Sequence, residues 1–580
     1  MTRRRFISSR FPLFGVAVLA SFGCSDERSN AGPSVGEPLA ADVDVGHDAA
    51  VDLTYVCGNR FLVSNSHGIP VSVGYRVAGS SEEGVAEVAA ALSIDPAVSE
   101  QYIETRTKGT VQIFLEGKPV VARANGGVPC TPDPQGPGFL VAPAAEAGQW
   151  SSPFAWPIVA VHMMLLPNGR VLAIGRTGSP HVWNPATNVF TAVPAPARLF
   201  CSGHALLSDG RVLVVGGHIE DRHGLPNTTL FSEGNGWSSS TAMARGRWYP
   251  TATTMGNGDV VITGGTDEAA VNVPIPEVWS NGTVRQLTGA QQNLPWYPRA
   301  FLAPNGSLFV AGPAVQTRFL SVSGFGSWKA GPPHLHPSGR TYGGAVMYDE
   351  GKILYAGGAL TTNTAEVIDL NQANPTWSWT SPMAFARRHH NLTVLPTGEV
   401  LATGGVAGTT FNDISTAVRA AEIWNPQTGQ WTTLASNAIT RGYHGTSLLL
   451  PDGRVLNAGS GEGAGAPNER NAEFFSPPYL LRGARPVITT APTEIRYGEQ
   501  FRIVTPQAAG IRKVSLIRLG AVTHAFDENQ RFQRLSFTAD PTGLTVTAAS
   551  SSNRTPPGHY MVFILNDNDV PSVAKILRIF

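Results

Sequence analysis

Phenol, imidazole and thiol side chains occur in this sequence just before short apolar strands. Tyr443 and His444 are adjacent and precede an apolar run that ends near Gly453. On a regular strand two neighbours point to opposite faces, but at the mouth of a strand both can turn onto one ligand. Cys201 and Tyr249 occupy comparable places earlier in the chain. Nitrogen and oxygen donors with few thiols suit Cu(II) in a tetragonal site with one open position, so the sequence predicts a copper site.

These side chains share a nearly constant distance to a turn glycine. Cys201, Tyr249 and Tyr342 lie nine residues before Gly210, Gly258 and Gly351, His390 lies eight before Gly398, and Tyr443 lies ten before Gly453. In a repeated fold such offsets fall on the same face, so the side chains are expected to converge on a central axis. For Tyr342 and His390, hydrogen bonding that only anchors the mouth of a repeat is an equally open interpretation. A further imidazole is His524; a lone histidine is usually on the surface, but a loop could bring it to the axis.

The elements that position these residues are repeated β-hairpins. Each repeat is an apolar strand, a turn that ends in glycine, a second apolar strand and often Gly-Gly. The turn glycines are Gly169, Gly210, Gly258, Gly306, Gly351, Gly398 and Gly453. Asn-Gly and Asp-Gly turns favour tight hairpins, and a period of about 50 residues with Gly-Gly and a following Trp is typical of the kelch blade. The sequence therefore predicts an all-β fold with a seven-bladed kelch propeller over residues 150–482; a tandem of β-sandwiches is the disfavoured alternative.

Two smaller β domains are predicted on either side of the propeller. Residues 51–130 alternate like strands and indicate a small β-sandwich, which Cys57 and Cys130 would close with a disulfide in an oxidising compartment. Residues 131–149 are the expected linker. Residues 483–580 lose the kelch pattern and are predicted to form an immunoglobulin-like β-sandwich, which would carry His524.

The first fifty residues predict export. Arg3–Arg5 precede an apolar run that is too short to span a bilayer, as in a signal peptide over residues 1–23. The run ends at Cys24 in a lipobox-like sequence, so Cys24 is a candidate lipid anchor, with residues 24–50 as a flexible tether. A plain secretory peptide with Cys24 lost or free is the alternative, and both Tat and Sec routes stay open. The formal net charge is zero without a basic stripe, which disfavours nucleic acid as a partner.

Several motifs in order give the chain a family resemblance over roughly residues 150–580. They are Phe200–Cys201, Arg247-Trp-Tyr-Pro-Thr251, Arg441-Gly-Tyr-His444 with its following strand, Ser515 to His524, and Pro557-Gly-His-Tyr-Met-Val-Phe563. With these motifs the chain resembles the galactose oxidase and glyoxal oxidase family of copper radical oxidases. The Trp248–Tyr249–Pro250 form resembles the glyoxal oxidase branch. The resemblance also carries a departure, because the loop of residues 265–272 lacks the tryptophan that stacks on the radical tyrosine in galactose oxidase.

The resemblance implies a role for each site residue. Tyr249, Tyr443, His444 and His524 would bind one copper ion, and Cys201 would be joined to Tyr249 by a thioether. Tyr443 would be the general base, and a Tyr249 radical would abstract hydrogen from the substrate carbon. Tyr342, His390 and Trp248 would adjoin the ligands. The expected reaction is oxidation of a glyoxal-like aldehyde or a primary alcohol, with reduction of O2 to H2O2.

Two other functions compete with this hypothesis. A non-catalytic surface propeller that binds a glycan or a protein partner would keep the blades without binding copper. A glycoside-cleaving propeller would need paired carboxylates at the blade mouths, where this sequence has Tyr, Cys and His. The protein is also expected to be a monomer that contacts the membrane only through the lipid anchor. Its expected location is the bacterial cell envelope or the medium outside the cell.

Overall fold

The computed structural model describes residues 144–463 and 465–580, together with segments between residues 51 and 123. The chain separates into two compact units, residues 1–131 and 132–580, each of which is described by itself. The predicted signal peptide, tether and candidate anchor Cys24 lie outside the described residues. None of the described helices is long and apolar enough to cross a membrane.

The first unit contains two antiparallel sheets. One comprises β1 (Val51–Cys57), β2 (Arg60–Asn65) and β5 (Ser99–Glu104), and the other β4 (Glu83–Val88), β3 (Val71–Val77), β6 (Val111–Leu115) and β7 (Lys118–Arg123). Leu53, Phe61, Val73 and Ile113 are among the fully buried side chains of their common core. Buried residues alternate with more exposed ones along β3 and at the start of β6, as in a sheet with one face turned inward. Cys130 and the side chain of Cys57 lie outside the described residues, so their disulfide stays a prediction.

The described part of the second unit contains α1 (Ala144–Ala147) and is otherwise almost entirely β. Seven antiparallel sheets follow one another along the described part of residues 149–476; each contains four strands in a row, and the first and the seventh have further strands added. Their strands are β10 (His162–Leu165), β11 (Val171–Ile174), β12 (His181–Asn184) and β13 (Val189–Ala192); β14 (Gly203–Leu206), β15 (Val212–Val215), β18 (Thr228–Ser232) and β19 (Gly236–Ser239); β20 (Thr251–Thr254), β21 (Val260–Thr263), β22 (Glu277–Ser280) and β23 (Thr283–Gln286); β24 (Ala300–Leu302), β25 (Leu308–Val310), β26 (Gln316–Ser321) and β27 (Ser327–Pro333); β28 (Gly344–Asp349), β29 (Lys352–Ala356), β30 (Ala365–Asp369) and β31 (Trp377–Thr380); β32 (Asn391–Val394), β33 (Val400–Thr403), β34 (Ala420–Asn425) and β35 (Gln430–Ser436); and β36 (Gly445–Leu449), β37 (Val455–Gly459), β38 (Asn471–Ser476) and β8 (Gln149–Trp150).

The sheets correspond one to one with the predicted repeat units. In each of them the turn glycine joins the first two strands, and its positive φ, 88° at Gly258 and at Gly398, is the conformation that favours glycine. The first strands contact one another in chain order, β14 with β20, β20 with β24, β28 with β32, and β32 with β36, while β36 contacts β10. The seventh sheet takes β8 from the start of the unit, and β9 (Phe154–Ala155) also pairs with β38. The predicted all-β fold is confirmed; the count of seven blades around one axis stays a prediction.

A buried Arg–Glu pair recurs at the mouths of four sheets. The pairs are Arg247–Glu277 (2.9 Å), Arg340–Glu366 (2.5 Å), Arg387–Glu422 (2.7 Å) and Arg441–Glu473 (3.1 Å). The arginine precedes the first strand and the glutamate lies on the third. Each carboxylate also accepts a backbone N–H, for instance from Ala384 at 2.6 Å. The pairs therefore fix the loops that lead into the first strands, and these loops carry the candidate site residues.

We expect the Glu422→Gln variant to lose about 3 kcal/mol of unfolding free energy, because it leaves the Arg387 guanidinium buried without a counter-charge. The measurement is the urea midpoint of the propeller transition. Glu494→Gln is the control, since Glu494 pairs with Arg578 on the surface with its side chain 54% exposed, where an ion pair contributes less than about 1 kcal/mol. Equal losses in the two variants would contradict the positioning role of the buried pair.

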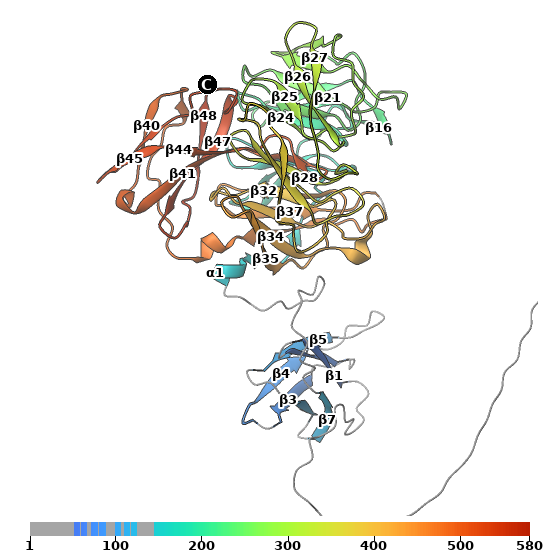
Figure 1. Cartoon of the computed structure of the whole chain (residues 1–580), viewed down its shortest axis with the longest axis vertical. Helices are drawn as coiled ribbons and strands as arrows, with labels where there is room; N and C mark the ends of the chain where they lie inside the picture. The colour runs from blue at the N-terminus through green and yellow to red at the C-terminus, as the bar shows by residue number, and fades with distance from the viewer. Residues whose placement is uncertain are drawn as a thin grey trace, which may run out of the picture. The chain divides into compact units, whose positions relative to one another are not determined.

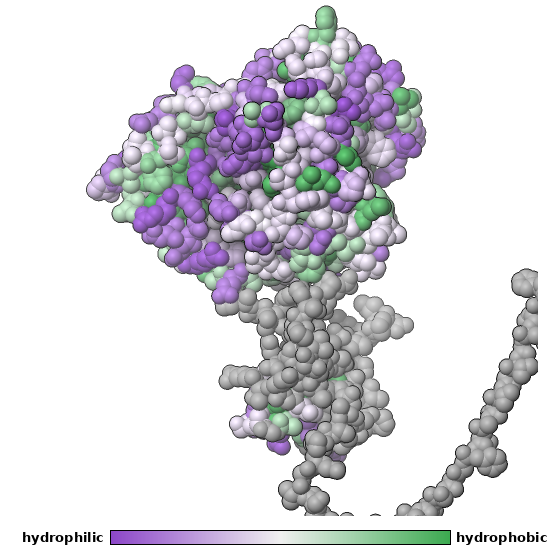
Figure 2. All heavy atoms as spheres, viewed as in Figure 1, coloured by the Kyte–Doolittle hydropathy of each residue, from purple (hydrophilic) through white to green (hydrophobic). Residues whose placement is uncertain are grey.

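The C-terminal domain packs against the propeller sheets with a sandwich of its own (Figure 1). One sheet has the order β39 (Glu494–Ile495), β48 (Lys575–Ile579), β47 (Gly558–Asn566), β41 (Ile511–Arg518) and β44 (Phe532–Leu535); the other comprises β40 (Gln500–Val504), β46 (Gly543–Thr547) and β45 (Phe537–Asp540). Short 3-10 helices cover Ile414–Thr416, Pro478–Leu481 and Ala508–Gly510. On the face drawn in Figure 2, hydrophilic and hydrophobic residues are interspersed over this unit.

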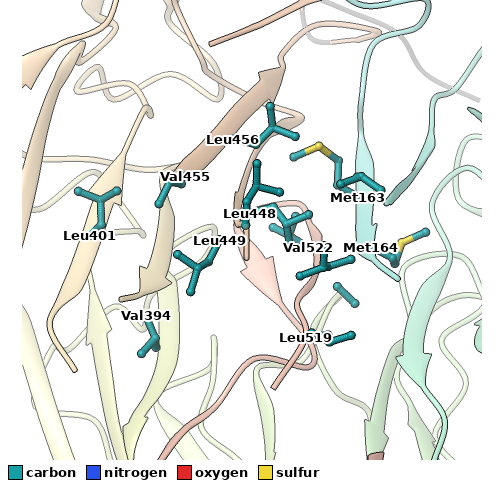
Figure 3. Close-up of a cluster of buried hydrophobic side chains, with 14 of the residues drawn as sticks. Met163, Met164, Val394, Leu401, Leu448, Leu449, Val455, Leu456, Leu519 and Val522 are labelled. Carbon is teal, nitrogen blue, oxygen red and sulfur yellow. The ribbon is translucent and has the colours of Figure 1, made fainter. Parts of the chain in front are cut away.

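A hairpin from the C-terminal domain enters the centre of the propeller sheets. It consists of β42 (Ala521–Thr523) and β43 (Phe526–Asp527), and β42 pairs antiparallel with β10. The hairpin contacts the first strands β14, β28, β32 and β36 as well. Figure 3 shows Val522 of the hairpin among Met163, Leu448 and Leu449 from these strands. The buried core is thus continuous between the two domains, and the hairpin turn is held from several sides.

Candidate functional site

Six residues at the entrances to the first strands have a left-handed backbone. Their φ values are 63° at Cys201, 66° at Tyr249, 45° at Tyr297, 57° at Tyr342, 62° at His389 and 66° at His444. Each lies nine residues before its turn glycine. Non-glycine residues rarely adopt this conformation unless the surrounding structure imposes it, and such residues cluster at functional sites. The repeated sharp turn explains why the side chains of different sheets meet.

Four of the predicted ligands meet in one buried cluster. The Tyr249 and Tyr443 hydroxyls are hydrogen-bonded to each other. The Tyr249 hydroxyl also lies 3.0 Å from Nε2 of His524. The His444 ring stacks on Tyr443 with centroids 3.8 Å apart, and it lies 4.6 Å from the His524 ring. The structure thus brings residues from the third sheet, the seventh sheet and the C-terminal hairpin to one point.

The hydrogen bonds fix which nitrogen of each imidazole faces the cluster. The Thr523 hydroxyl donates to the Val161 carbonyl, so it accepts from Nδ1–H of His524 at 2.5 Å. Nε2 of His524 then carries the lone pair and accepts from Tyr249. His444 donates from Nδ1 to the Gly461 carbonyl at 2.6 Å. Its Nε2 also carries a lone pair, and it is buried without a partner among the described residues.

Burial keeps these groups in their neutral forms. It lowers the pKa of His444 to about 3 and lowers that of His524 well below its usual value. Neutral imidazoles with Nδ1 held by an oxygen are the metal-binding form. Burial also raises the pKa of Tyr249 and of Tyr443 far above the usual range. A cation would be needed to deprotonate them. Two phenols and two imidazoles therefore fit a Cu(II) ion, and within the described residues no group of three His, Cys, Asp or Glu competes with them.

Cys201 belongs to the same buried cluster. It is a free cysteine, packed in a cluster that includes Trp248, Tyr249 and Tyr297. Its carbonyl accepts the Tyr249 N–H at 2.9 Å. Burial raises the pKa of the Cys201 thiol, which hydrogen bonding to Tyr249 opposes. A thiol beside a phenol is what a thioether cross-link would require, and this thiol has no disulfide partner.

Trp248 covers the Tyr249 ring. The two rings are stacked with centroids 3.6 Å apart and an interplanar angle of 3°. The loop of residues 265–272 lacks a tryptophan, as the sequence shows, but Trp248 supplies a stacked tryptophan from another position. The reason is the left-handed turn at Tyr249, which brings two adjacent side chains to one side of the chain. The Trp248 indole N–H donates to Nδ1 of His218 at 3.2 Å, which fixes the ring from its outer edge.

Two residues of the cluster were not anticipated from the sequence. Tyr297 lies 4.5 Å from the Tyr249 ring and stacks on His524 at 4.6 Å. His389 lies 5.2 Å from the Tyr443 ring and thus takes the place expected for His390. A strict offset of nine residues from Gly306 and Gly398 would have identified both. His390 is instead fully buried, with no partner for either ring nitrogen among the described residues.

Tyr342 adjoins the cluster as expected. Its ring meets the Tyr443 ring edge-on with centroids 5.9 Å apart. Burial raises the pKa of Tyr342 to about 12, which hydrogen bonding to Tyr443 opposes. Tyr342, Tyr249 and Tyr297 also line a cavity of about 320 Å³. A small molecule in this cavity would therefore reach the Tyr249 ring.

Comparisons with known proteins find two matching families and several relatives. Residues 341–479 match the model of the glyoxal oxidase N-terminus, and residues 485–579 match the galactose oxidase-like early set domain. A galactose oxidase of Gibberella zeae is 32% identical over 491 residues, which are 76% of this chain and 71% of that protein. The aldehyde oxidase GLOX of Vitis pseudoreticulata is 35% identical over 231 residues, which are 36% of this chain and 43% of that protein.

A solved structure has a similar fold. It is described as a fungal alcohol oxidase of catalytic diversity in complex with copper, and it has 25% sequence identity and a TM-score of 0.68. It covers 75% of this chain, which in turn spans all of that structure. The identity to galactose oxidase extends over more than two thirds of both chains. The chain is therefore an oxidoreductase that belongs to the galactose oxidase and glyoxal oxidase family of copper radical oxidases.

Proposed function

We propose that this protein oxidises a small aldehyde or a primary alcohol and reduces O2 to H2O2 at one copper ion. Tyr249, Tyr443, His444 and His524 would hold the ion. The observation that carries this assignment is the convergence of two Nε2 lone pairs with two phenol oxygens, since His444 Nε2 is buried without a partner among the described residues. Bound copper would supply an open position for the substrate oxygen and one of two oxidising equivalents.

Two tyrosines would accept the proton and the hydrogen atom that the substrate loses. Tyr443 would accept the hydroxyl proton of an alcohol or hydrated aldehyde. Tyr249, oxidised to a phenoxyl radical, would take a hydrogen atom from the substrate carbon, so that substrate loses two electrons and two protons overall. O2 takes both electrons and both protons and leaves as H2O2. The stacked Trp248 would exclude water from one face of the radical.

The Cys201 thioether to Tyr249 would make the radical easier to form. The cross-link removes one hydrogen from sulfur and one from the ring, and O2 is the oxidant. Trp248 and Tyr342 would adjoin the ligands, and His389 joins them in place of His390. We further propose an exported monomer, with Cys24 as the lipid anchor and Cys57 joined to Cys130.

The test is a peptide mass map of protein matured with copper and air. We expect the peptides that contain Cys201 and Tyr249 to run as one species, lighter by two hydrogens than their sum. Protein made without copper and the Cys201→Ser variant are the controls and should give free peptides. Free peptides in the matured wild type would overturn the radical mechanism and favour the non-catalytic propeller.

A further inference from the structure

The cavity beside Tyr249 is apolar along one wall and positively charged. Leu294, Pro295, Trp296 and Pro313 line it, and so do Arg222 and Arg299, whereas its lining contains no acidic side chain. Trp296 contacts both Tyr249 and Arg222 in this lining. Its ring meets the Tyr249 ring edge-on at 5.9 Å, and the Arg222 guanidinium carbon lies 5.7 Å from the Trp296 ring centre.

The two arginines differ in what their donors contact. Arg299 is buried, and its guanidinium donates to the carbonyls of Tyr297, His524 and Gly343. Its charge contributes to the potential of the cavity, but these donors are occupied. Arg222 is exposed, and among the residues that the structure describes no hydrogen bond or ion pair engages its guanidinium.

The hairpin that carries Arg222 holds it in this place. The hairpin is formed by β16 (His218–Glu220) and β17 (His223–Gly224). The Arg222 carbonyl accepts the Thr266 hydroxyl, and its φ of 75° is a left-handed turn. The neighbouring carboxylate of Asp221 is paired with Arg176 at 3.0 Å and so does not neutralise Arg222. The backbone of Arg222 is thus held at the cavity rim, with its guanidinium over the Trp296 ring.

We infer that the substrate of the proposed oxidase carries a carboxylate, which Arg222 binds while the aldehyde or alcohol carbon faces Tyr249. This inference rests on the proposed function and narrows its substrate class. The planar guanidinium matches a carboxylate with two parallel hydrogen bonds, and contact with an indole face favours this orientation. The apolar wall would contact the carbons between the two ends. Arg299 and Arg222 together disfavour substrates with an amine at the far end.

The first experiment compares 4-oxobutanoate with butanal, which differ only in the carboxylate. We expect the wild type to have about a tenfold higher kcat/KM for 4-oxobutanoate, which is the order of a charge-assisted hydrogen bond at a partly exposed site. Arg222→Gln should remove this preference, so that 4-oxobutanoate and butanal have similar kcat/KM values. Arg222→Lys should retain part of it. Lys329→Gln, an exposed cation on β27 with the same charge change, should keep the preference.

The second experiment measures binding without copper or turnover. Calorimetric titration of the copper-free protein with 4-hydroxybutanoate should give about tenfold weaker affinity for Arg222→Gln than for the wild type and Lys329→Gln. Equal affinities, or a wild type that does not prefer 4-oxobutanoate, would overturn the role of Arg222. Failure of the proposed function looks different, because no aldehyde or alcohol would then yield H2O2, while the titration would still report on Arg222.

Discussion

The Tyr249→Phe variant is expected to lose at least about 10³-fold in kcat, while its fold stays intact. The substitution removes one oxygen, but that oxygen has three roles in the proposed site. It would be a copper ligand, it is hydrogen-bonded to both Tyr443 and His524, and it is the atom from which a phenoxyl radical would be formed. Losses of this size are typical where a residue takes part directly in the bond-breaking step.

The measurements are H2O2 production and the radical absorption band of the oxidised protein. Tyr348→Phe is the matched control, because Tyr348 lies on β28 and meets Trp424 at 4.8 Å, in the contact between two sheets. It should keep both signals. The Tyr249 ring is buried at 1% exposure and remains in the Phe variant, so the urea midpoint should change little. A Tyr249→Phe protein with wild-type turnover would exclude the proposed mechanism.

The repeat could be predicted from the sequence because its physical signals are local. Turn glycines with positive φ and alternating apolar strands recur in every unit, and the structure has one antiparallel sheet for each. The site was predicted less completely. Offsets of eight to ten residues favour His390, whereas the left-handed turn lies nine residues before Gly398 and places His389 at the site. Because the backbone turns sharply at His389, the next side chain, that of His390, is buried away from the Tyr443 ring.

Contacts between distant segments explain why the rest of the site could not be predicted from the sequence. The stacking of Trp248 depends on the left-handed backbone conformation at Tyr249, which cannot be predicted from the residue type. Likewise Arg222 lies at the cavity because the β16–β17 hairpin is held by the Thr266 hydroxyl, which donates to the Arg222 carbonyl, and by the Asp267 carbonyl, which accepts the Gly224 N–H. These arrangements arise from the packing of loops on neighbouring sheets, for which the sequence offers no periodic signal.

The same loops show how stability and function are connected in this fold. Arg247 precedes Tyr249 by two residues, and Arg441 precedes Tyr443 by two, and both arginines are bound to a buried glutamate. The ion pairs hold the backbone where the left-handed turns would otherwise relax. The propeller sheets thus act as a rigid support, and the loops carry the candidate site residues.

His524→Ala is expected to weaken copper binding at least about 100-fold. Substitution of a residue that only hydrogen-bonds to a metal ligand can already lower metal affinity by up to about 100-fold. His524 is the ligand that the C-terminal domain would contribute. It lies in a two-residue turn in which His524 and Ala525 both have positive φ, 45° and 64°, as type I′ hairpins require. Thr523, Tyr297 and Arg299 fix its ring and its carbonyl, so alanine leaves a gap that no neighbouring donor can fill.

Competition titration with a copper chelator measures this loss directly. His181→Gln is the control, because His181 is half-buried on β12 and its ring is hydrogen-bonded to the Ser179 carbonyl, away from the proposed copper ligands. It should bind copper as the wild type does. If His524→Ala kept wild-type affinity, the hairpin would be a structural plug alone, and the copper site would belong entirely to the propeller loops. A large loss with an unchanged urea midpoint would instead show that the two domains form one catalytic centre, because the hairpin that fills the propeller core also completes the donor set.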